Sequence, residues 1–152
     1  MAHIVFVFGW PGQGKSTLAK TLVDEAAFRR VDVDDLYVRF IRTEFPQAAT
    51  ADLEQQILGH YDRTFSRDET QRRAWHDHFL AVIVAAAADY AEVVVDGYLL
   101  WDCRTAFDGA LTKAGHRVLH LRADSFRYTQ VAPVDLTAKA VVAALKSSEL
   151  PV

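Results

Sequence analysis

The sequence predicts a three-layer α/β fold, in which a parallel β-sheet lies between two layers of helices. Apolar runs of strand length alternate with amphipathic segments of helix length, and a glycine-rich loop joins the first run to the first helix. Polar residues cluster just after the predicted strands, where ligands bind in such sheets. The 152 residues favour a single domain over 1–152, and 51% hydrophobic residues suffice for a substantial core.

The first part of the chain supplies two strands and two helices. An unbroken apolar run at 4–8 is typical of a strand buried on both faces. The segment 16–23 places Leu18, Leu22 and Val23 on one face of a helix. A short second strand that ends in acidic residues, and a helix that stops before a proline, are predicted at 29–35 and 35–44.

Residues 38–66 form a predicted insertion between the second strand and a long helix. Within it, Thr50 is predicted to cap a helix. The apolar face of that helix would comprise Leu53, Ile57, Leu58 and Tyr61. The long helix is predicted over about 67–90, with acidic residues in its first turn as the helix dipole prefers. Its predicted apolar stripe is Trp75, Phe79, Val82, Ile83, Ala86 and Tyr90.

The second part of the chain continues the alternation. Gly97 ends a third strand at 92–96, and Gly115 closes a helix at 101–114. A fourth strand is expected at 116–121. A connection at 122–130, a short fifth strand near 128–132 and a last helix at 135–148 complete the predicted fold.

Residues 9–16 match G-x-x-x-x-G-K-[ST], the pattern of the phosphate-binding P-loop. The flanking strand and helix are the context in which backbone N–H groups surround a phosphate at a helix N-terminus. Lys15 would then contact the β- and γ-phosphates, and the Ser16 hydroxyl would bind Mg²⁺. A glycine-rich turn that matches by chance is the alternative, which the flanking elements disfavour. The expected nucleotide-binding residues are Gly12, Gln13, Gly14, Lys15, Ser16 and Thr17.

Acidic residues follow the second and third predicted strands, at the edge of the sheet that also carries the P-loop. Asp34 is the candidate general base, which would accept the proton of an acceptor hydroxyl. Asp96 is expected to hold Mg²⁺ through water, Asp32 to assist Mg²⁺ or the substrate, and Asp35 to cap the next helix. A solvated turn with a helix cap and a simple Asp-Gly turn are the alternatives at these two places.

Arginine and aromatic residues near the same edge are weaker candidates. Arg122 and Arg127 follow the fourth strand, where a positive clamp on the transferred phosphate would lie, and a surface position is the alternative for each. Further arginines lie on the predicted acceptor side, most of them as solvated residues: Arg39, Arg42, Arg63, Arg67, Arg72 and Arg73. Four aromatic residues are candidates for stacking on a ring, with packing as the alternative: Trp10, Tyr37, Tyr98 and Trp101.

The composition narrows the class of protein. A net charge of −3 argues against strong non-specific binding of nucleic acid. Cys103 is the only cysteine, which excludes a disulfide framework and fits a reducing cytoplasm. The longest apolar run, 79–88, is too short to span a bilayer, so no membrane association is expected. His76 and His78 do not share a helical face, and the histidines are not predicted as metal ligands.

These residues together resemble the P-loop kinase group, which includes polynucleotide 5′-kinases and small-metabolite and nucleotide kinases. Residues 9–17, followed by a strand that ends in Val33-Asp34-Asp35, are similar to the polynucleotide kinase pattern G-x-P-G-x-G-K-S-T and then D-D. Asp32-x-Asp34 resembles the D-x-D of shikimate-type kinases. Asp96-Gly97-Tyr98 looks like the D-G-[FY] of nucleoside monophosphate kinases.

That resemblance implies a P-loop NTPase fold with a five-stranded parallel sheet in the order 2-3-1-4-5. It also implies that Asp34 is the general base, that Asp32 contacts Mg²⁺ or the substrate, and that the cofactors are ATP and Mg²⁺. Gly97 and Tyr98 would then lie at the substrate, with Arg39 as the nearest candidate for a substrate arginine.

Three features depart from the kinase group. Leu99-Leu100 stands where nucleotide kinases have Pro-Arg, so their substrate arginine is missing. Tyr37 stands where polynucleotide kinases have an arginine. The segment 122–130 is much shorter than the arginine-rich lid of these families. Because lids exclude water, we expect either a leak of ATP hydrolysis or a large substrate that closes the site.

The predicted function is transfer of the γ-phosphate of ATP to a hydroxyl group. We expect the insertion at 38–66 to bind the acceptor that carries this hydroxyl group. The motifs and the short lid favour a nucleic-acid or nucleotide hydroxyl, whereas the acidic net charge favours a small metabolite, and both acceptors stay open. An NTP-binding switch or NTPase without a phosphorylated acceptor is the alternative from another class, followed by a nucleotide-binding scaffold. The expected compartment is the cytoplasm.

Overall fold

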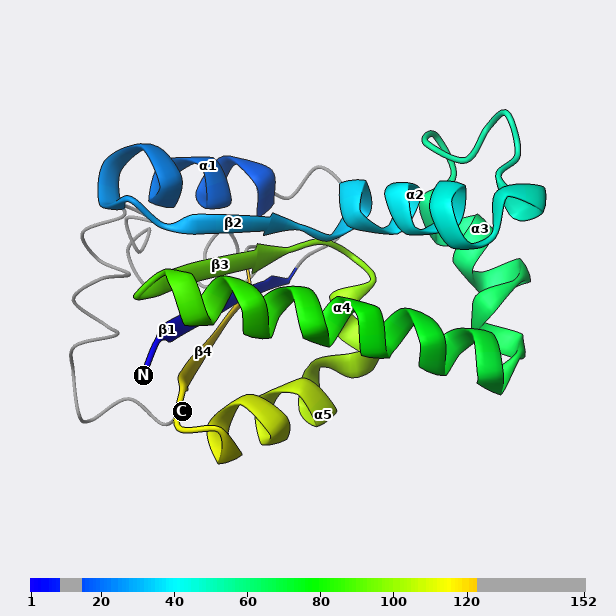
Figure 1. Cartoon of the computed structure of the whole chain (residues 1–152). Coiled ribbons are helices and arrows are strands. Elements are labelled where there is room, and N and C mark those ends of the chain that lie inside the picture. Colours follow the sequence, from blue (N-terminus) through cyan, green and yellow to red (C-terminus); the bar gives the residue numbers. More distant parts are fainter. Residues whose placement is uncertain (9–14, 123–152) are drawn as a thin grey trace.

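The computed structural model describes residues 1–8 and 15–122, which contain a four-stranded parallel sheet (Figure 1). The strand order is β2-β3-β1-β4, which confirms the predicted order for these four strands. The predicted fifth strand near 128–132 and last helix at 135–148 lie outside the described residues. The four strands are β1 (His3–Phe8), β2 (Arg29–Asp32), β3 (Glu92–Asp96) and β4 (Arg117–Arg122).

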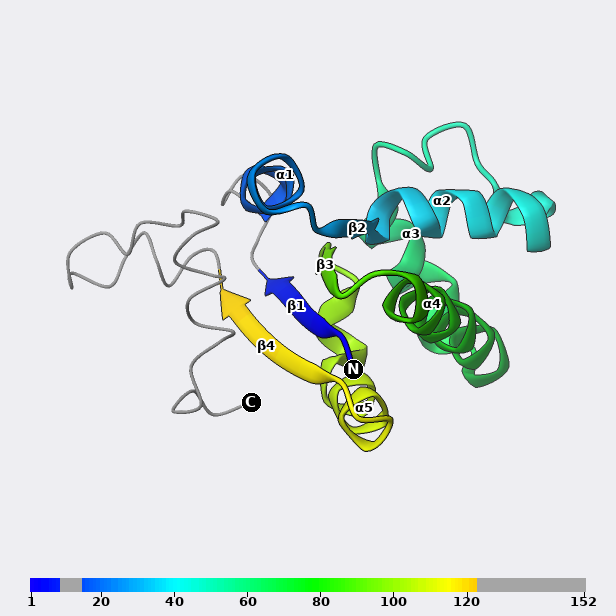
Figure 2. The ribbon, with the colours of Figure 1, turned by 60° about the vertical axis from the view of Figure 1, so that its left-hand side comes forward.

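Helices cover both faces of the sheet, as predicted (Figure 2). α1 (Lys15–Ala26) packs on one face, and α4 (Glu69–Asp89) and α5 (Leu100–Lys113) pack on the other. Successive side chains of a strand point to opposite faces, so an unbroken apolar run fills both cores. The α1 side contains Val5, Val7, Val94, Leu119 and Leu121, and the other side contains Ile4, Phe6, Val93, Val95 and Val118.

The second strand is shorter than predicted, and the helix after it begins earlier. β2 ends at Asp32 and α2 spans Val33–Glu44, so the predicted end of the strand at residue 35 was wrong. The Asp32 carboxylate accepts a hydrogen bond from the Asp35 N–H at 3.2 Å, and the Asp32 backbone is extended. Asp32 rather than Asp35 is therefore the N-cap, and Asp34 falls in the acidic first turn that the helix dipole favours.

The helix predicted to begin at Thr50 begins at Ile57 instead, so its predicted start was wrong. It contains Ile57, Leu58 and Tyr61 of the predicted apolar face but not Leu53. Residues 51–55 form turns, in which the Leu53 N–H donates to the carbonyl of Thr50 and the Gln55 N–H donates to that of Asp52. The turns bury Leu53 to 1% exposure while residues on either side stay exposed. A short helix is costly to start, so burial of one apolar anchor decides the local conformation. The elements of this segment are η1 (Pro46–Ala48), α3 (Ile57–Arg63) and η2 (Phe65–Arg67).

Buried His60 joins this segment to α2. Its Nε2 lies 2.7 Å from the carbonyl oxygen of Ala48, which can only accept, so Nε2 carries the proton. Nδ1 of the neutral ring therefore accepts from the Tyr37 hydroxyl, 2.7 Å away. Burial raises the pKa of Tyr37 above its usual range and keeps this donor protonated. Tyr37 has no exposure and packs edge-to-face on Tyr61 and Trp75, so it is a core residue and cannot stack on a ligand.

The remaining elements lie close to their predicted positions. Asp68 caps α4 through a hydrogen bond from the Gln71 N–H at 3.1 Å, which fixes the start of the helix at Glu69. Tyr90 was wrongly placed in the apolar stripe, because it is 45% exposed just after the helix ends. Gly115 closes the turn before β4 with φ of +91°, which favours glycine. Within the described ranges, no helix has the length and apolarity needed to cross a membrane.

Substitution Tyr37→Phe should lower the free energy of unfolding by about 1–3 kcal/mol, because it leaves the buried Nδ1 of His60 without its donor. Urea unfolding of both proteins measures the difference. The matched control is Tyr90→Phe, which removes a hydroxyl from an exposed ring and should change the stability by less than about 0.5 kcal/mol. Equal effects of the two substitutions would contradict the role given to His60.

Candidate functional site

The strand register brings two acidic residues to one edge of the sheet. Asp96 at the end of β3 is paired with Asp32 on β2 and with Val7 on β1. Val7 and Val94 pack on the α1 side, so the side chains of Asp96 and Asp32 share that face of the sheet. The predicted P-loop, 9–16, joins the end of β1 to the start of α1 at this edge.

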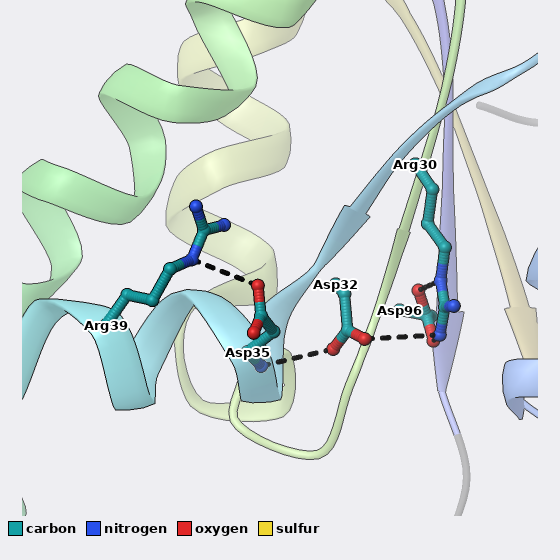
Figure 3. Close-up of polar contacts among 5 residues, drawn as sticks. All are labelled: Arg30, Asp32, Asp35, Arg39 and Asp96. Carbon is teal, nitrogen blue, oxygen red and sulfur yellow. Dashed lines mark hydrogen bonds and ion pairs between the residues drawn. The ribbon is translucent and has the colours of Figure 1, made fainter.

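Arg30 holds these two carboxylates together (Figure 3). Its Nε and Nη2 each donate to a different oxygen of Asp96, both at 2.8 Å, and Nη2 also lies 3.6 Å from Oδ2 of Asp32. Asp96 is 2% exposed, and a carboxylate at that depth needs a partner of opposite charge. Arg30 was not among the site residues predicted from the sequence. The Arg-x-Asp spacing of β2 could have indicated this role, because it places Arg30 and Asp32 on one face of the strand.

The charge of Arg30 acts on all three candidate acidic residues. The hydrogen bond to Asp96 is the main cause that raises the pKa of its guanidinium, against an opposing effect of burial. The negative charges of Asp96, Asp32 and Asp34 raise that pKa further. Arg30 is therefore a permanent cation among the residues that the sequence assigned to metal binding and base catalysis.

Asp34 lies in the first turn of α2, against the loop that follows β3. Gly97 begins this loop with φ of +151°, a conformation that L residues rarely adopt. A Cβ on Gly97 would lie 2.5 Å from Cβ of Val33 and 3.4 Å from Oδ1 of Asp34. Glycine at this position thus allows α2 to approach β3 and sets the place of the candidate base. The resemblance had assigned Gly97 to substrate contact, which stays a prediction beside this structural role.

A cavity of about 380 Å³ opens between the strand ends, α2 and the turn at 51–57. The candidate base and both candidate metal-binding carboxylates lie in its wall, and part of the predicted insertion forms the opposite side. Two ion pairs form between lining residues: Arg39 with Asp35, and Arg42 with Glu54, both at 3.0 Å. The lining residues are Asp32, Asp34, Asp35, Val38, Arg39, Arg42, Glu54, Ile57, Asp96 and Gly97.

Other predicted residues lie elsewhere. Arg72 donates to the carbonyl of Ser66, and Arg73 pairs with Glu69, so neither of these two arginines is among the residues that line this cavity. Tyr98 is half-buried at the end of β3, and its substrate role stays a prediction. Several assignments fall outside the residues or side chains that the structure describes: Trp10, Gly12, Gln13, Gly14, Lys15, Ser16, Arg122 and Arg127. Val38, Glu54 and Ile57 also line the cavity. None of them was predicted as an individual site residue, although all three lie in the segment 38–66 that was predicted to bind the acceptor.

The carboxylates at this edge have the chemistry that Mg²⁺ prefers. Hard oxygen ligands suit Mg²⁺, which binds through one or two carboxylates, waters and the phosphates of a nucleotide. Accordingly, a cage of three or more protein ligands is not required, and the described residues contain none. Asp32 is 42% exposed in its side chain and can reach solvent, whereas both oxygens of Asp96 already accept from Arg30. Asp96 would therefore act through water, as the sequence predicts.

Comparison with protein families identifies the class. The model of the AAA domain family AAA_33 matches residues 4–130, which include the P-loop and all four strands except for His3 at the start of β1. The chain therefore belongs to this family of P-loop kinase-like proteins, and the sheet described above fits the P-loop NTPase fold. Proteins of this group generally bind a nucleotide and Mg²⁺. No curated protein matches the chain.

Among solved structures, the chain is similar to one named "putative kinase" from Chloroflexus aurantiacus J-10-fl. The two are 16% identical, with a TM-score of 0.49, and the similarity covers 80% of this chain. The chain spans 58% of the length of that structure.

Substitution Arg30→Met should lower the free energy of unfolding by about 2–3 kcal/mol, because it leaves the buried carboxylate of Asp96 without a counter-charge. Asp96→Asn in the Arg30→Met background should cost much less than in the wild type, since the charge that needs compensation is already gone. Urea unfolding of the four proteins of this cycle measures the coupling. Arg29→Met, which replaces the exposed arginine next to Arg30, is the matched control. Additive effects of Arg30→Met and Asp96→Asn would show that Arg30 does not compensate the charge of Asp96.

Gly97→Ala should destabilise the fold by about 2–3 kcal/mol, because the new Cβ meets Val33 in a backbone conformation that already costs an L residue energy. Thermal or urea unfolding provides the measurement. Gly109→Ala is the matched control: it lies within α5, a Cβ there meets nothing within 4 Å, and it should stabilise the protein by about 0.5–1 kcal/mol. A Gly97→Ala protein as stable as the wild type would show that α2 can move away from the loop.

Proposed function

We propose that this protein transfers the γ-phosphate of ATP to a hydroxyl group of an acceptor bound in the cavity beside α2. The observation that carries the proposal is the position of Asp34. It lines a cavity at the carboxyl ends of the strands, at the edge where the P-loop joins β1 to α1. Ligands of open α/β sheets bind at such an edge.

The P-loop would bind ATP through backbone N–H groups of Gly12 to Thr17, with Lys15 at the β- and γ-phosphates. Ser16, Asp32 and, through water, Asp96 would hold Mg²⁺. When bound, that ion would neutralise charge on the phosphates. Arg30 keeps the carboxylate of Asp96 fixed beside Asp32, so that part of this site needs no rearrangement.

Asp34 would act as the general base at the acceptor. The acceptor hydroxyl oxygen forms a bond to the γ-phosphorus, and the bond from that phosphorus to the β–γ bridging oxygen breaks. ADP leaves, and the hydroxyl proton passes to Asp34. The carboxylate is half-buried and points to the same cavity as Asp32 and Asp96. The negative charge of Asp34 also contributes to the raised pKa of Arg30, so the two charges attract each other.

Residues 38–66 would form the acceptor-binding part of the single domain. Val38, Arg39 and Arg42 on α2 face Glu54 and Ile57 across the cavity. The Tyr37–His60–Ala48 hydrogen bonds fix the two sides of this insertion to each other. A rigid wall would position the acceptor hydroxyl near Asp34, which is the main requirement of phosphoryl transfer.

Label transfer from γ-labelled ATP with Mg²⁺ tests the proposal. Asp34→Asn and Lys15→Ala should each reduce transfer to an acceptor by about 10²–10⁴-fold, because one removes the base and the other a phosphate contact. Asp24→Asn and Lys20→Ala are matched controls, since both residues are exposed on α1 away from the cavity.

Three outcomes of this experiment distinguish a kinase from an NTPase and test the role of Asp34. Label on an acceptor that is lost in both variants supports the kinase and identifies its substrate. Label that appears as free phosphate alone, and still depends on Lys15, favours an NTPase over a kinase. Transfer that survives Asp34→Asn removes Asp34 from the role of base.

A further inference from the structure

We infer that Arg30 makes metal binding at this site depend on the nucleotide, because it keeps a divalent cation from the carboxylates of Asp32 and Asp96 until phosphates are present. This inference rests on the proposed function, since it concerns the metal site of that reaction. It is drawn from the bonds of Arg30, from the unequal engagement of the two carboxylates and from the second role of Asp32 at the start of α2. Arg30 acts through these carboxylates and is therefore a positioning residue.

Asp96 is the carboxylate that Arg30 engages more completely (Figure 3). Nε of Arg30 donates to Oδ1 and Nη2 donates to Oδ2, both at 2.8 Å, so each oxygen of Asp96 has a guanidinium donor. Direct binding of a divalent cation to either oxygen would bring it beside that guanidinium. Because Asp96 is 2% exposed, water screens the repulsion between these like charges only weakly. Arg30 therefore opposes direct coordination of a metal by Asp96.

Asp32 is engaged less completely than Asp96. Its Oδ1 accepts from the Asp35 N–H at 3.2 Å and caps α2. Its Oδ2 lies 3.6 Å from Nη2 of Arg30, which is beyond hydrogen-bonding distance, and the side chain is 42% exposed. Of the four carboxylate oxygens of Asp32 and Asp96, Oδ2 of Asp32 is thus the one that a metal can reach without breaking a hydrogen bond and without removing the cap of α2.

One carboxylate oxygen is not enough to hold Mg²⁺ against water. Mg²⁺ loses its water reluctantly, and in nucleotide sites it takes one or two carboxylates together with phosphate oxygens. Within the ranges that the structure describes, no group of three or more acidic, histidine or cysteine side chains could hold a metal ion. Asp34 and Asp96 have further interactions in the structure, so neither is a bare carboxylate. The missing ligands would come from the phosphates of the nucleotide.

The negative charge of the phosphates also changes the balance at Arg30. Without a nucleotide, the guanidinium and a divalent cation compete for the same two carboxylates. With a nucleotide, the metal has the phosphates and Oδ2 of Asp32 as partners, and Arg30 can keep both of its hydrogen bonds to Asp96. Metal and nucleotide would therefore bind together, and the buried end of β3 would stay fixed while they do.

Titration of the nucleotide-free full chain with Mn²⁺, a probe of Mg²⁺ sites, tests this inference, with free Mn²⁺ measured by electron paramagnetic resonance at pH 8. Arg30→Met should bind Mn²⁺ about tenfold or more tightly than the wild type, because the charge that opposes the metal is gone. Arg30→Lys keeps a positive charge and should stay within about threefold of the wild type. Arg29→Met is the matched control, since it removes the same charge from the opposite face of β2.

Urea unfolding with and without Mg²⁺ gives a second measurement and shows whether the variants fold. A metal that binds only the folded protein raises the urea concentration at the midpoint of unfolding. Mg²⁺ should raise this midpoint for nucleotide-free Arg30→Met, but not for the wild type or Arg29→Met. Combining Arg30→Met with Asp96→Asn should abolish the effect of Mg²⁺, because the carboxylate that the first substitution released is then absent.

Asp32→Asn tests the nucleotide-bound site and does not depend on the stability of the Arg30 variants. Asparagine is as good an N-cap as aspartate, so this substitution removes the carboxylate and keeps the cap of α2. Mg²⁺ should strengthen the binding of a non-hydrolysable ATP analogue to the wild type by about tenfold or more, and Asp32→Asn should lose most of that gain. Asp24→Asn, on the exposed side of α1, is the matched control and should retain it.

The outcomes separate this inference from the proposed function. Nucleotide-free wild type that binds Mn²⁺ as tightly as Arg30→Met overturns the inference, and so does an equal gain in Arg29→Met. An Asp32→Asn protein that keeps the full effect of Mg²⁺ also overturns it, because the metal then does not depend on Asp32. The expected Mn²⁺ results without phosphoryl transfer to any acceptor support the role of Arg30 and contradict the kinase. An ATP analogue that does not bind at all contradicts both.

Discussion

The bidentate pair between Arg30 and Asp96 is the interaction on which the arrangement of this site depends. Parallel strands bring Asp32 and Asp96 side by side at the edge of the sheet, and Asp96 is buried there. Two adjacent carboxylates repel each other, and burial increases the cost. One guanidinium, held by two hydrogen bonds of 2.8 Å, offsets that repulsion and fixes the ends of β2 and β3 relative to each other.

The start of α2 depends on the same junction. Asp32 ends the strand, caps the helix and lies near Arg30, so one residue sets both the end of β2 and the direction in which α2 leaves the sheet. Gly97 lets the first turn of α2 approach the neighbouring loop, and Asp34 is placed over the cavity as a result. The base and the metal-binding carboxylates of the proposed kinase are thus parts of one packed unit.

The insertion between α2 and α4 adds the properties that would distinguish one acceptor from another. Its His60 bonds both to Tyr37 of α2 and to the carbonyl of Ala48, and its Glu54 pairs with Arg42, one of the two arginines among the described residues that line the cavity. The sheet edge would thus carry the groups for phosphoryl transfer, and the insertion would contribute to the choice of acceptor.

Much of the fold could be predicted from the sequence, because it rests on local patterns. An apolar run such as 4–8 indicates a strand that is buried on both faces. The P-loop pattern indicates a strand before it and a helix after it. Two errors lie where tertiary contacts decide: the turns that bury Leu53 and the burial of Tyr37. The cap at Asp32 is a local contact, but the end of β2 before it coincides with the end of the pairing with β3. The sequence by itself determined the family and the order of the four described strands, whereas the role of Asp34 as the base stays a prediction. Only the tertiary structure decided that Arg30 neutralises Asp96 and that Glu54 engages Arg42, since such pairs join residues that are distant in the chain and become neighbours on folding.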